Sequence, residues 1–354
     1  MILDRLIPAI GVDDPHALLI LRAALAALIS LLVSLAAGRP VIAYLRRLKI
    51  AERTEKTPIE DENLRRRIID KSGTPTMGGI ILLAGVLAGC LAGGNVADPP
   101  LGLTLLCMLA LSLLGVADDR LKLAGKGHRE RGLKPWHKLA YQACAGGMAG
   151  ALLIRRTAAV AGSGFLSLVP LLQTGAFFAT IVVMGWAALL VTTLSNATNV
   201  TDGLDGLLAG LAAIASATLA GACIFLGGPN AGPMSVFFAS MAGACLGFLW
   251  FNRHPARVFM GDTGSLAVGG GMACAALAAR MELLLLVAGL VFLVEFGSSL
   301  LQMGWFKVFR KRILPIAPIH HIPQRMDMPE RRIVRGFYFG GGVAALMGLT
   351  LLWT

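Results

Sequence analysis

Long runs of apolar residues, separated by short polar stretches, dominate this chain. A run of about 20 apolar residues is long enough to cross a bilayer as a helix. Such runs predict about ten transmembrane helices, near residues 18–38, 76–96, 99–117, 138–155, 176–194, 204–226, 233–251, 263–279, 283–304 and 334–353. We therefore expect an all-α, polytopic integral membrane protein whose residues 1–354 form a single transmembrane domain.

The composition agrees with this class of protein. Of the 354 residues, 56% are hydrophobic and only 15% are charged, and the mean hydropathy is +0.72. These values lie far from those of soluble domains. The first residues are too short, too acidic and too proline-broken for a cleavable signal peptide. The six cysteines fall inside apolar runs without CxxC spacing, so they are expected to be small core residues.

Basic residues are distributed unevenly between the connections. They gather in residues 39–75, 118–138 and 305–335, whereas the alternate connections carry almost none. By the positive-inside rule, this asymmetry places both termini outside. It also predicts cytoplasmic loops at about 39–75, 118–137, 195–203, 252–262 and 305–333. The net charge of +12 could suggest nucleic-acid binding, but no recognition module or aromatic-interleaved basic patch accompanies it. No nucleic-acid partner is expected.

Five aspartates stand within a turn or two of apolar runs, all on the predicted cytoplasmic side: Asp118, Asp119, Asp202, Asp205 and Asp262. A carboxylate near the membrane core is costly unless it faces a polar cavity, a cation or a metal. Three separate segments supply these aspartates, and random scatter would not put them all on one side. The pattern therefore indicates a shared metal and phosphate site.

A polar stripe adds amides to two of these carboxylates. Asn196, Asn199, Asp202 and Asp205 recur every three residues, a spacing that drifts by about 60° per step on a helix. Such a stripe cannot face lipid, where unsatisfied polar groups are expensive. Hydrogen bonding between helices would explain the two asparagines but not the added carboxylates. The stripe is expected to line a cavity.

Further polar segments on the same side supply cations and a glycine-rich turn. Lys122 follows Asp118 by one helical turn, and Asp262 lies in a Gly-Asp-Thr-Gly-Ser turn that could bind a hard cation and a phosphate. The adjacent His320 and His321 could bind a diphosphate or act as acid and base. Because Mg²⁺ prefers carboxylate and phosphate oxygens, the combination favours phosphoryl transfer between a soluble nucleotide donor and a lipid.

Residues 71–335 also carry a family resemblance, through GTPTMGG, DDRLK, NATNVTDGLDG, FNRHPARVFMGDTGS and the IHH loop. They resemble the polyprenyl-phosphate N-acetylhexosamine-1-phosphate transferase superfamily, and within it the phospho-N-acetylmuramoyl-pentapeptide transferase branch. The resemblance implies transfer of phospho-MurNAc-pentapeptide from UDP-MurNAc-pentapeptide to undecaprenyl phosphate, which gives lipid I and UMP for peptidoglycan synthesis. It further implies Mg²⁺, a bacterial inner membrane and an active site on the cytoplasmic face. A homodimer is a possible assembly.

The resemblance also implies roles for single residues. Asp118 and Asp119 would be the catalytic pair, with Asp118 the base toward the lipid phosphate, and His320 would join them. Asp262 and Asp202 would hold the metal, and Phe259 would stack on uracil. The substrate-binding residues would be Lys71, Thr76, Lys122, Lys134, Asn196, Asn199, Asp205, Asn252, Phe259, Gly261, Gln302 and His321.

One departure and three alternatives accompany this interpretation. The family loop has three consecutive histidines followed by an aromatic and an acidic residue, whereas this chain continues with Ile322, Pro323 and Gln324. Direct attack by the lipid phosphate is favoured over a covalent aspartyl intermediate because it needs fewer special features. A sibling transferase of GlcNAc-1-phosphate is the nearest alternative activity. A transporter is less favoured, because its acidic residues would lie near the bilayer midplane of inverted repeats.

Overall fold

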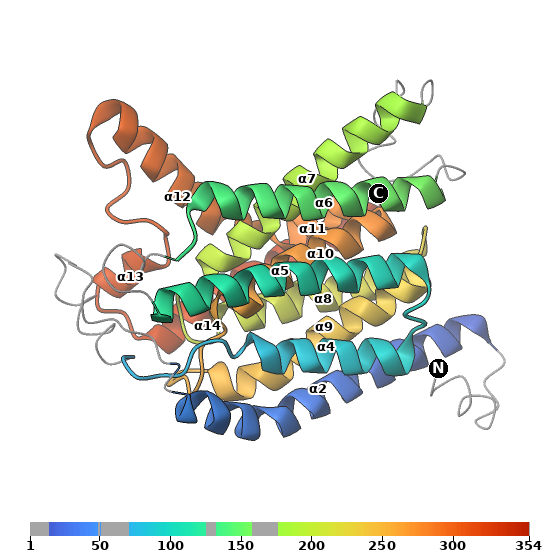
Figure 1. The fold of residues 1–354 in the computed structure, drawn as a ribbon, viewed down its shortest axis with the longest axis horizontal. Coiled ribbons are helices and arrows are strands. Elements are labelled where there is room, and N and C mark those ends of the chain that lie inside the picture. Colours follow the sequence, from blue (N-terminus) through green and yellow to red (C-terminus); the bar gives the residue numbers. More distant parts are fainter. Residues whose placement is uncertain (1–13, 49, 51–70, 125–131, 158–175, 354) are drawn as a thin grey trace.

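The computed structural model describes residues 14–48, 50, 71–124, 132–157 and 176–353 (Figure 1). Residues 1–13 and large parts of the expected loops 39–75 and 118–137 lie outside this range. Most of the described residues are helical and none of them forms a strand, so the all-α class is confirmed. In chain order the helices are α2 (Pro15–Arg47), α4 (Gly79–Gly93), α5 (Pro99–Ala124), α6 (Pro135–Thr157), α7 (Ala176–Thr201), α8 (Leu207–Leu226), α9 (Ala231–Asn252), α10 (Gly261–Ala279), α11 (Glu282–Ala288), α12 (Leu290–Phe309), α13 (His321–Arg325) and α14 (Glu330–Trp353).

Every expected span coincides with helix in this structure. Among the described residues, six helices are long and apolar enough to cross a membrane, or seven if α11 and α12 count as one bent span. The polytopic membrane class is thus confirmed, while the number ten stays a prediction. α10 reads as less apolar because it is rich in glycine and alanine, yet its residues 262–279 are all buried among the other helices.

Two helices continue well beyond their apolar stretches. α5 runs to Ala124 and α7 to Thr201, so Asp118 and Asn199 lie on helices instead of in loops. Hydropathy marks only the part of a helix that contacts lipid or an apolar core. The last turns of α5 and α7 are polar and lie at one end of the bundle, where their side chains pair with residues of other helices. This pairing keeps the two turns helical.

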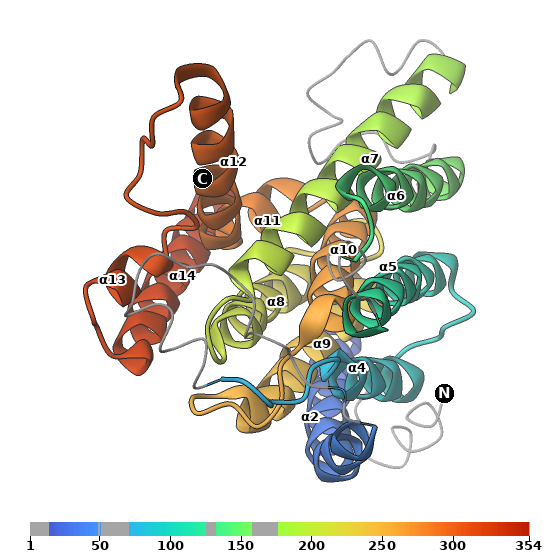
Figure 2. The same ribbon diagram turned by 60° about the vertical axis from the view of Figure 1, so that its left-hand side comes forward.

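The expected span 283–304 is broken near its start. α11 ends at Ala288, α12 begins at Leu290, and the two helices meet at Gly289 with a bend of 73°. α12 consequently leans away from the other helices (Figures 1 and 2). Large apolar side chains on it are exposed, among them Leu300, Leu301 and Met303. A helix surface of this kind suits contact with lipid chains.

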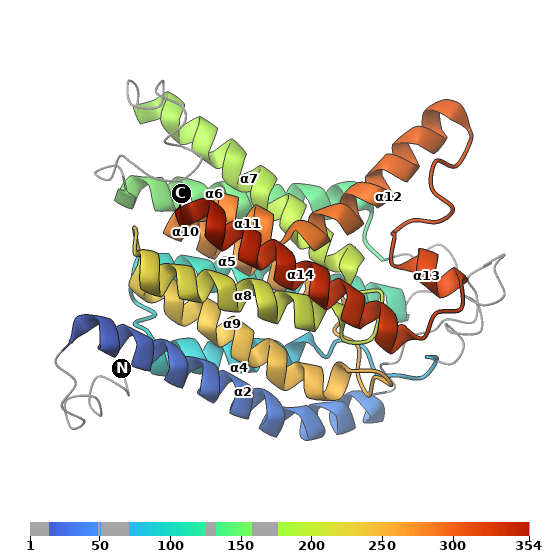
Figure 3. The same cartoon turned by 180° about the vertical axis from the view of Figure 1, so that it is seen from behind.

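Small residues allow the helices around α9 to pack closely. Gly89 of α4 faces Ser30 of α2, and Gly243 of α9 lies against the backbone of Ala27. Close backbone approach through small residues is the usual packing of helices in membranes. In the view from behind, α2, α8, α9 and α14 lie side by side (Figure 3).

The polar segments gather at one end of this bundle. The chain before α4, the turn after α7, the loop before α10 and the helix α13 all lie at the left of Figure 1. The start of α2 and the end of α14 lie toward the opposite end. The fold therefore brings the predicted site segments together at one end.

Candidate active site

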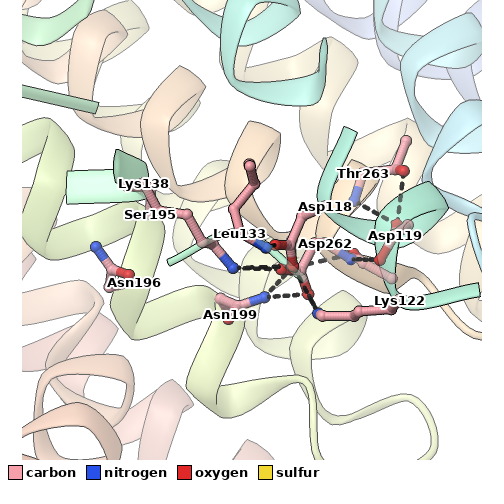
Figure 4. A network of polar contacts seen from close by, with 12 residues as sticks. Asp118, Asp119, Lys122, Leu133, Lys138, Ser195, Asn196, Asn199, Asp262 and Thr263 are labelled. Atoms are coloured by element: carbon pink, nitrogen blue, oxygen red, sulfur yellow. Dashed lines mark hydrogen bonds and ion pairs between the residues drawn. The ribbon is translucent and has the colours of Figure 1, made fainter. Parts of the chain in front are cut away.

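Asp118 lies near the end of α5 and is almost fully buried. Its Oδ1 accepts a hydrogen bond of 2.7 Å from the backbone N–H of Leu133. Its Oδ2 lies 2.7 Å from Lys122 Nζ, one turn further along α5, and 3.2 Å from Lys138 Nζ of α6. Both oxygens of this carboxylate are therefore engaged (Figure 4).

Asp262, in the first turn of α10, shares the same two ammonium groups. Its Oδ1 lies 3.1 Å from Lys122 Nζ, and its Oδ2 lies 2.6 Å from Lys138 Nζ. Asn199 of α7 donates its amide N–H to Asp262 Oδ1 at 3.0 Å and to Ser265 Oγ at 2.9 Å. The start of a helix favours negative charge, so α10 also stabilises this carboxylate.

Asp119 points the other way and holds the start of α10 from a neighbouring helix. Its two oxygens accept the backbone N–H groups of Asp262 and Thr263, at 3.2 and 3.0 Å, and the hydroxyl of Thr263 at 2.7 Å. These N–H groups have no partner within α10, since the first turn of any helix leaves its donors free. Asp119 thereby fixes the place of Asp262. This geometry supports a positioning role for Asp119.

We call Asp118, Asp119, Lys122, Lys138, Asn199 and Asp262 the carboxylate cluster. Charges taken out of water must be paired, and here two ammonium groups lie between two carboxylates. The side chain of Lys122 is 41% exposed, whereas that of Lys138 is 16% exposed. Lys122 can thus withdraw toward solvent more easily than Lys138.

Lys71 joins a second group of charged residues, which we call the Lys71 cluster: Lys71, Asp205, His254 and Glu330. Lys71 Nζ lies 2.7 Å from both Asp205 Oδ1 and Glu330 Oε1. His254 Nδ1 lies 2.9 Å from Asp205 Oδ2, and Glu330 also accepts the backbone N–H of Asp205 at 2.7 Å. Burial works against the charged ammonium, but the carboxylates of Glu330 and Asp205 outweigh it and raise the pKa of Lys71.

The Lys71 cluster also contains three residues whose ligand atoms lie close enough together to hold a metal ion: Asp205, His254 and Glu330. Lys71 already neutralises two of these side chains with its ammonium group. The cluster joins the chain before α4, the turn after α7, the loop before α10 and the start of α14. Its present partners therefore explain the cluster as a link between these four segments.

The two predicted histidines lie next to each other in different surroundings. His320 is buried, and its Nδ1 lies 2.9 Å from Oε2 of the buried Glu295 on α12. His321 is half-buried, and its Nδ1 lies 2.7 Å from Gln324 Oε1. Burial, together with the neighbouring His320, lowers the pKa of His321 to about 4.

Several predicted substrate residues form hydrogen bonds with the protein's own backbone or side chains. Asn252 accepts the N–H of Gly206 and donates to the carbonyl of Val258. Gln302 accepts two backbone N–H groups of the loop after α12, and Asn196 donates to Gln142, away from the carboxylates in Figure 4. Each of these amides therefore already has a partner within the protein.

The remaining predicted residues lie around the two clusters. Thr76 and Gly261 approach Asp119, because a Cβ added at Gly261 would lie 2.8 Å from Asp119 Oδ2 and 2.9 Å from Thr76 Oγ1. Phe259 is half-buried and tied through its backbone to the segment of Lys71, since its N–H donates to the carbonyl of Pro75 at 2.8 Å. Asp202 is half-buried at the end of α7, and Lys134 is exposed.

Sequence reasoning missed four residues that the structure brings into these groups: Lys138, His254, Glu295 and Glu330. Lys138 sits one turn beyond the predicted Lys134, so both belong to the same basic segment. The register of α6 decides between them, and sequence spacing alone does not give it. Glu295 carried a signal, because a carboxylate inside an apolar run needs a partner.

Comparisons with known proteins identify the same family from matches to family models and from relatives that align over nearly their full length. Residues 101–280 match glycosyl transferase family 4, and residues 71–83 match the phospho-N-acetylmuramoyl-pentapeptide-transferase signature 1. A phospho-N-acetylmuramoyl-pentapeptide-transferase of Salinibacter ruber is 35% identical, over 94% of this chain and 92% of that protein. The enzyme of the same name from Solidesulfovibrio magneticus is also 35% identical, with the same coverage.

A third relative of that name, from Moorella thermoacetica, is 37% identical over 90% of this chain and 95% of its own length. Identity of this level over nearly the whole of both chains extends well beyond the short motifs. It covers the helices that carry both clusters. The chain belongs to the phospho-N-acetylmuramoyl-pentapeptide-transferase family, a family of membrane transferases of peptidoglycan synthesis.

Proposed function

We propose that this protein transfers phospho-MurNAc-pentapeptide from UDP-MurNAc-pentapeptide to undecaprenyl phosphate, giving lipid I and UMP. One observation carries the proposal beyond the family name. Asp118 and Asp262, on two different helices, share the ammonium groups of Lys122 and Lys138 at the polar end of the bundle. Such a cluster suits a reaction in which two anionic phosphates must approach each other.

Mg²⁺ fits the donor set of the carboxylate cluster. Asp118 and Asp262 offer hard oxygen ligands, and the two lysines already mark the space between them as favourable for positive charge. We assign Asp262 as the principal ligand, with Asp118 beside it and Asp202 as a further ligand suggested by its motif. When bound, Mg²⁺ would offset the charge of the donor diphosphate. The exposed Lys122 is the cation that would give way to it.

The reaction needs one bond to form and one to break. An oxygen of the lipid phosphate attacks the β-phosphorus of the donor, and the bond from that phosphorus to the bridging oxygen of UMP breaks. Asp118 Oδ2 accepts a proton from the lipid phosphate when the phosphate arrives protonated. Lys122 and Lys138 then bind oxygens of the substrate phosphates. These oxygens take the place of the carboxylate oxygens that the two lysines contact in the structure. Direct attack requires no covalent aspartyl phosphate.

The nucleotide is proposed to bind beside the Lys71 cluster. Lys71 and Asp205 supply polar groups there, and Phe259 offers a ring for stacking on uracil. The backbone bond between Phe259 and Pro75 keeps that ring next to the segment that carries Lys71. His320 and His321 would meet the phosphate side of the donor. The arrangement gives the base and the diphosphate separate partners.

We place the reaction at the cytoplasmic face of a bacterial inner membrane. The polar end of the bundle is also the end at which basic segments concentrate, including the residues after α12. Basic residues near the ends of membrane helices favour the cytoplasmic side. A soluble UDP-linked donor would reach the site from that side, while the lipid would enter from the bilayer.

A UMP-release assay on the purified protein in lipid tests this proposal. We expect UMP from UDP-MurNAc-pentapeptide and undecaprenyl phosphate with Mg²⁺, and little UMP with UDP-GlcNAc or with EDTA. Activity with UDP-GlcNAc alone would instead support the sibling transferase, for which Ile322 and Gln324 in the histidine loop would then be a signature. Asp262→Asn is expected to abolish the Mg²⁺-dependent rate and to weaken Mg²⁺ binding in calorimetry.

A further inference from the structure

Glu295 has a buried carboxylate, and His320 is the one hydrogen-bond partner of this carboxylate among the described residues. It lies in the second turn of α12, just beyond the bend at Gly289, and its exposed fraction is 0%. Its Oε2 lies 2.9 Å from His320 Nδ1, and its Oε1 has no hydrogen-bond partner among the described residues. A buried carboxylate without a compensating partner is strongly destabilising. The contact with His320 is therefore the interaction that compensates the burial of Glu295.

The contact with Glu295 determines which ring nitrogen of His320 is available to a ligand. An ionised carboxylate only accepts hydrogen bonds, so a charged Glu295 would place the proton of this contact on His320 Nδ1. The opposite nitrogen, Nε2, is buried and has no hydrogen-bond partner among the described residues. A buried ring nitrogen without a partner is unusual in a folded protein and indicates a group that awaits a ligand. Nε2 is the atom left for that purpose.

Nε2 points at the turn that carries Asp202 and Asp205. A Cβ added at Gly203 would collide with His320 Nε2, so the ring lies directly against the backbone between Asp202 and Leu204. Only a residue without a side chain leaves room for the imidazole there. The histidine thus bridges α12 and the turn after α7, beside the Lys71 cluster.

We propose that Glu295 is a positioning residue for His320: it fixes the Nδ1–H tautomer and the ring orientation, so that Nε2 meets the phosphate of a bound substrate. This inference rests on the proposed function and deepens it. A carboxylate behind an imidazole also stabilises the imidazolium that forms when Nε2 takes a proton. The group that meets the substrate is His320, and Glu295 acts only through it.

A double-mutant cycle on UMP release tests this assignment. Glu295→Gln keeps the size and an oxygen acceptor but removes the charge, and we expect kcat to fall by roughly 10–100-fold with little change in KM. His320→Asn should lower kcat further. If Glu295 acts only through His320, the double variant has the kcat of His320→Asn alone. Independent losses that multiply, or an unchanged kcat for Glu295→Gln, would overturn the proposal.

The matched control is Glu282→Gln, another buried glutamate, on the adjacent helix α11. It has no contact with the histidine loop in the described residues, so its kcat should stay close to that of the natural protein. Glu295→Asp, which keeps the charge, should recover part of the activity. Circular dichroism and the Tm in detergent of all variants separate loss of chemistry from loss of fold.

A measurement without substrate keeps this inference separate from the proposed function. ¹⁵N-histidine spectra of the protein in detergent report which ring nitrogen carries the proton, and the His320→Asn variant identifies the signal. We expect a protonated Nδ1 and an unprotonated Nε2 that change in Glu295→Gln but not in Glu282→Gln. The opposite tautomer would overturn the proposal even in an active enzyme. A lack of UMP release with the expected tautomer would refute only the proposed function.

Discussion

Lys138 Nζ lies 2.6 Å from Asp262 Oδ2, and this ion pair joins α6 to the first turn of α10. The same ammonium group lies 3.2 Å from Asp118 Oδ2 on α5. One lysine therefore holds two carboxylates of different helices at a separation that a cation can bridge. Neutralisation of this kind keeps the site assembled before any substrate arrives.

Replacement of Lys138 is expected to damage the site more than replacement of Lys134. Lys138→Ala leaves Asp118 and Asp262 facing each other with only the partly exposed Lys122 between them. We expect kcat for UMP release to fall by about 10²-fold or more, as for other preorganised charged groups of active sites. Lys134→Ala, at the exposed position, should cost less than about 10-fold.

The control for the lysine series is Lys311→Ala, an exposed lysine in the loop after α12. It removes the same charge from the same end of the bundle, so it accounts for general electrostatic attraction of the anionic donor. Its kcat is expected to match that of the natural protein. A ranking in which Lys134→Ala is the most damaged variant would contradict the geometry of the carboxylate cluster.

Gly261 is predicted to tolerate no side chain. Its φ is +70°, and a Cβ would lie within 3.0 Å of both Asp119 and Thr76. The left-handed backbone alone costs an alanine roughly 1–2 kcal/mol. Gly261→Ala should therefore lower the Tm and UMP release together, because Asp119 loses its hold on α10. Gly185→Ala on α7, where the added Cβ meets nothing, should raise or preserve the Tm.

Hydropathy predicted the positions of the helices but not where they end or break. Apolar runs located α5 and α7 but stopped short of the polar turns that carry Asp118 and Asn199. These turns were placed in the connections 118–137 and 195–203, although the spacing of their polar residues was treated as helical. These turns stay helical because their polar groups pair with other helices, which no local pattern records. The run 283–304 stays predominantly apolar on both sides of Gly289, so its hydropathy did not indicate the 73° bend there.

The residue types of the site could be predicted from sequence, whereas their partners could not. Aspartates at the end of apolar runs identified Asp118, Asp119 and Asp262, since an unpaired carboxylate is costly there. Which cation compensates each one depends on contacts between distant segments, such as Lys71 with Glu330. The prediction of Asn252 and Gln302 as substrate residues stays untested, and their contacts give both a role in holding the backbone.

Glu330 is expected to contribute to stability through the Lys71 cluster. It pairs with Lys71 and accepts the backbone N–H of Asp205, and it is buried. Glu330→Gln retains an acceptor for the N–H but leaves the half-buried ammonium with Asp205 alone. We expect a loss of about 3 kcal/mol in the free energy of unfolding, the lower end of the range for a broken buried pair.

Thermal unfolding in detergent measures this loss, and the nearby Arg332 provides the control. Arg332 is exposed, and Arg332→Gln should change the free energy of unfolding by less than about 0.5 kcal/mol. In a Lys71→Met background, Glu330→Gln should cost much less than in the natural protein, because the ion pair is already absent. Equal losses in both backgrounds would show that the pair does not stabilise the fold.

The stability of the protein is expected to fall in mild acid because of His321. Burial and the neighbouring His320 lower its pKa to about 4, whereas an unfolded histidine titrates near 6.5. The unfolded state therefore binds more protons between these values, so the contribution of His321 is complete above pH 6.5 and is lost as the pH falls toward 4. Gln324→Glu would place a carboxylate beside Nδ1, raise this pKa and reduce the loss. The Tm in detergent at pH 7.5 and pH 5 measures the effect, and a drop as large in His321→Gln as in the natural protein would exclude His321 as its cause.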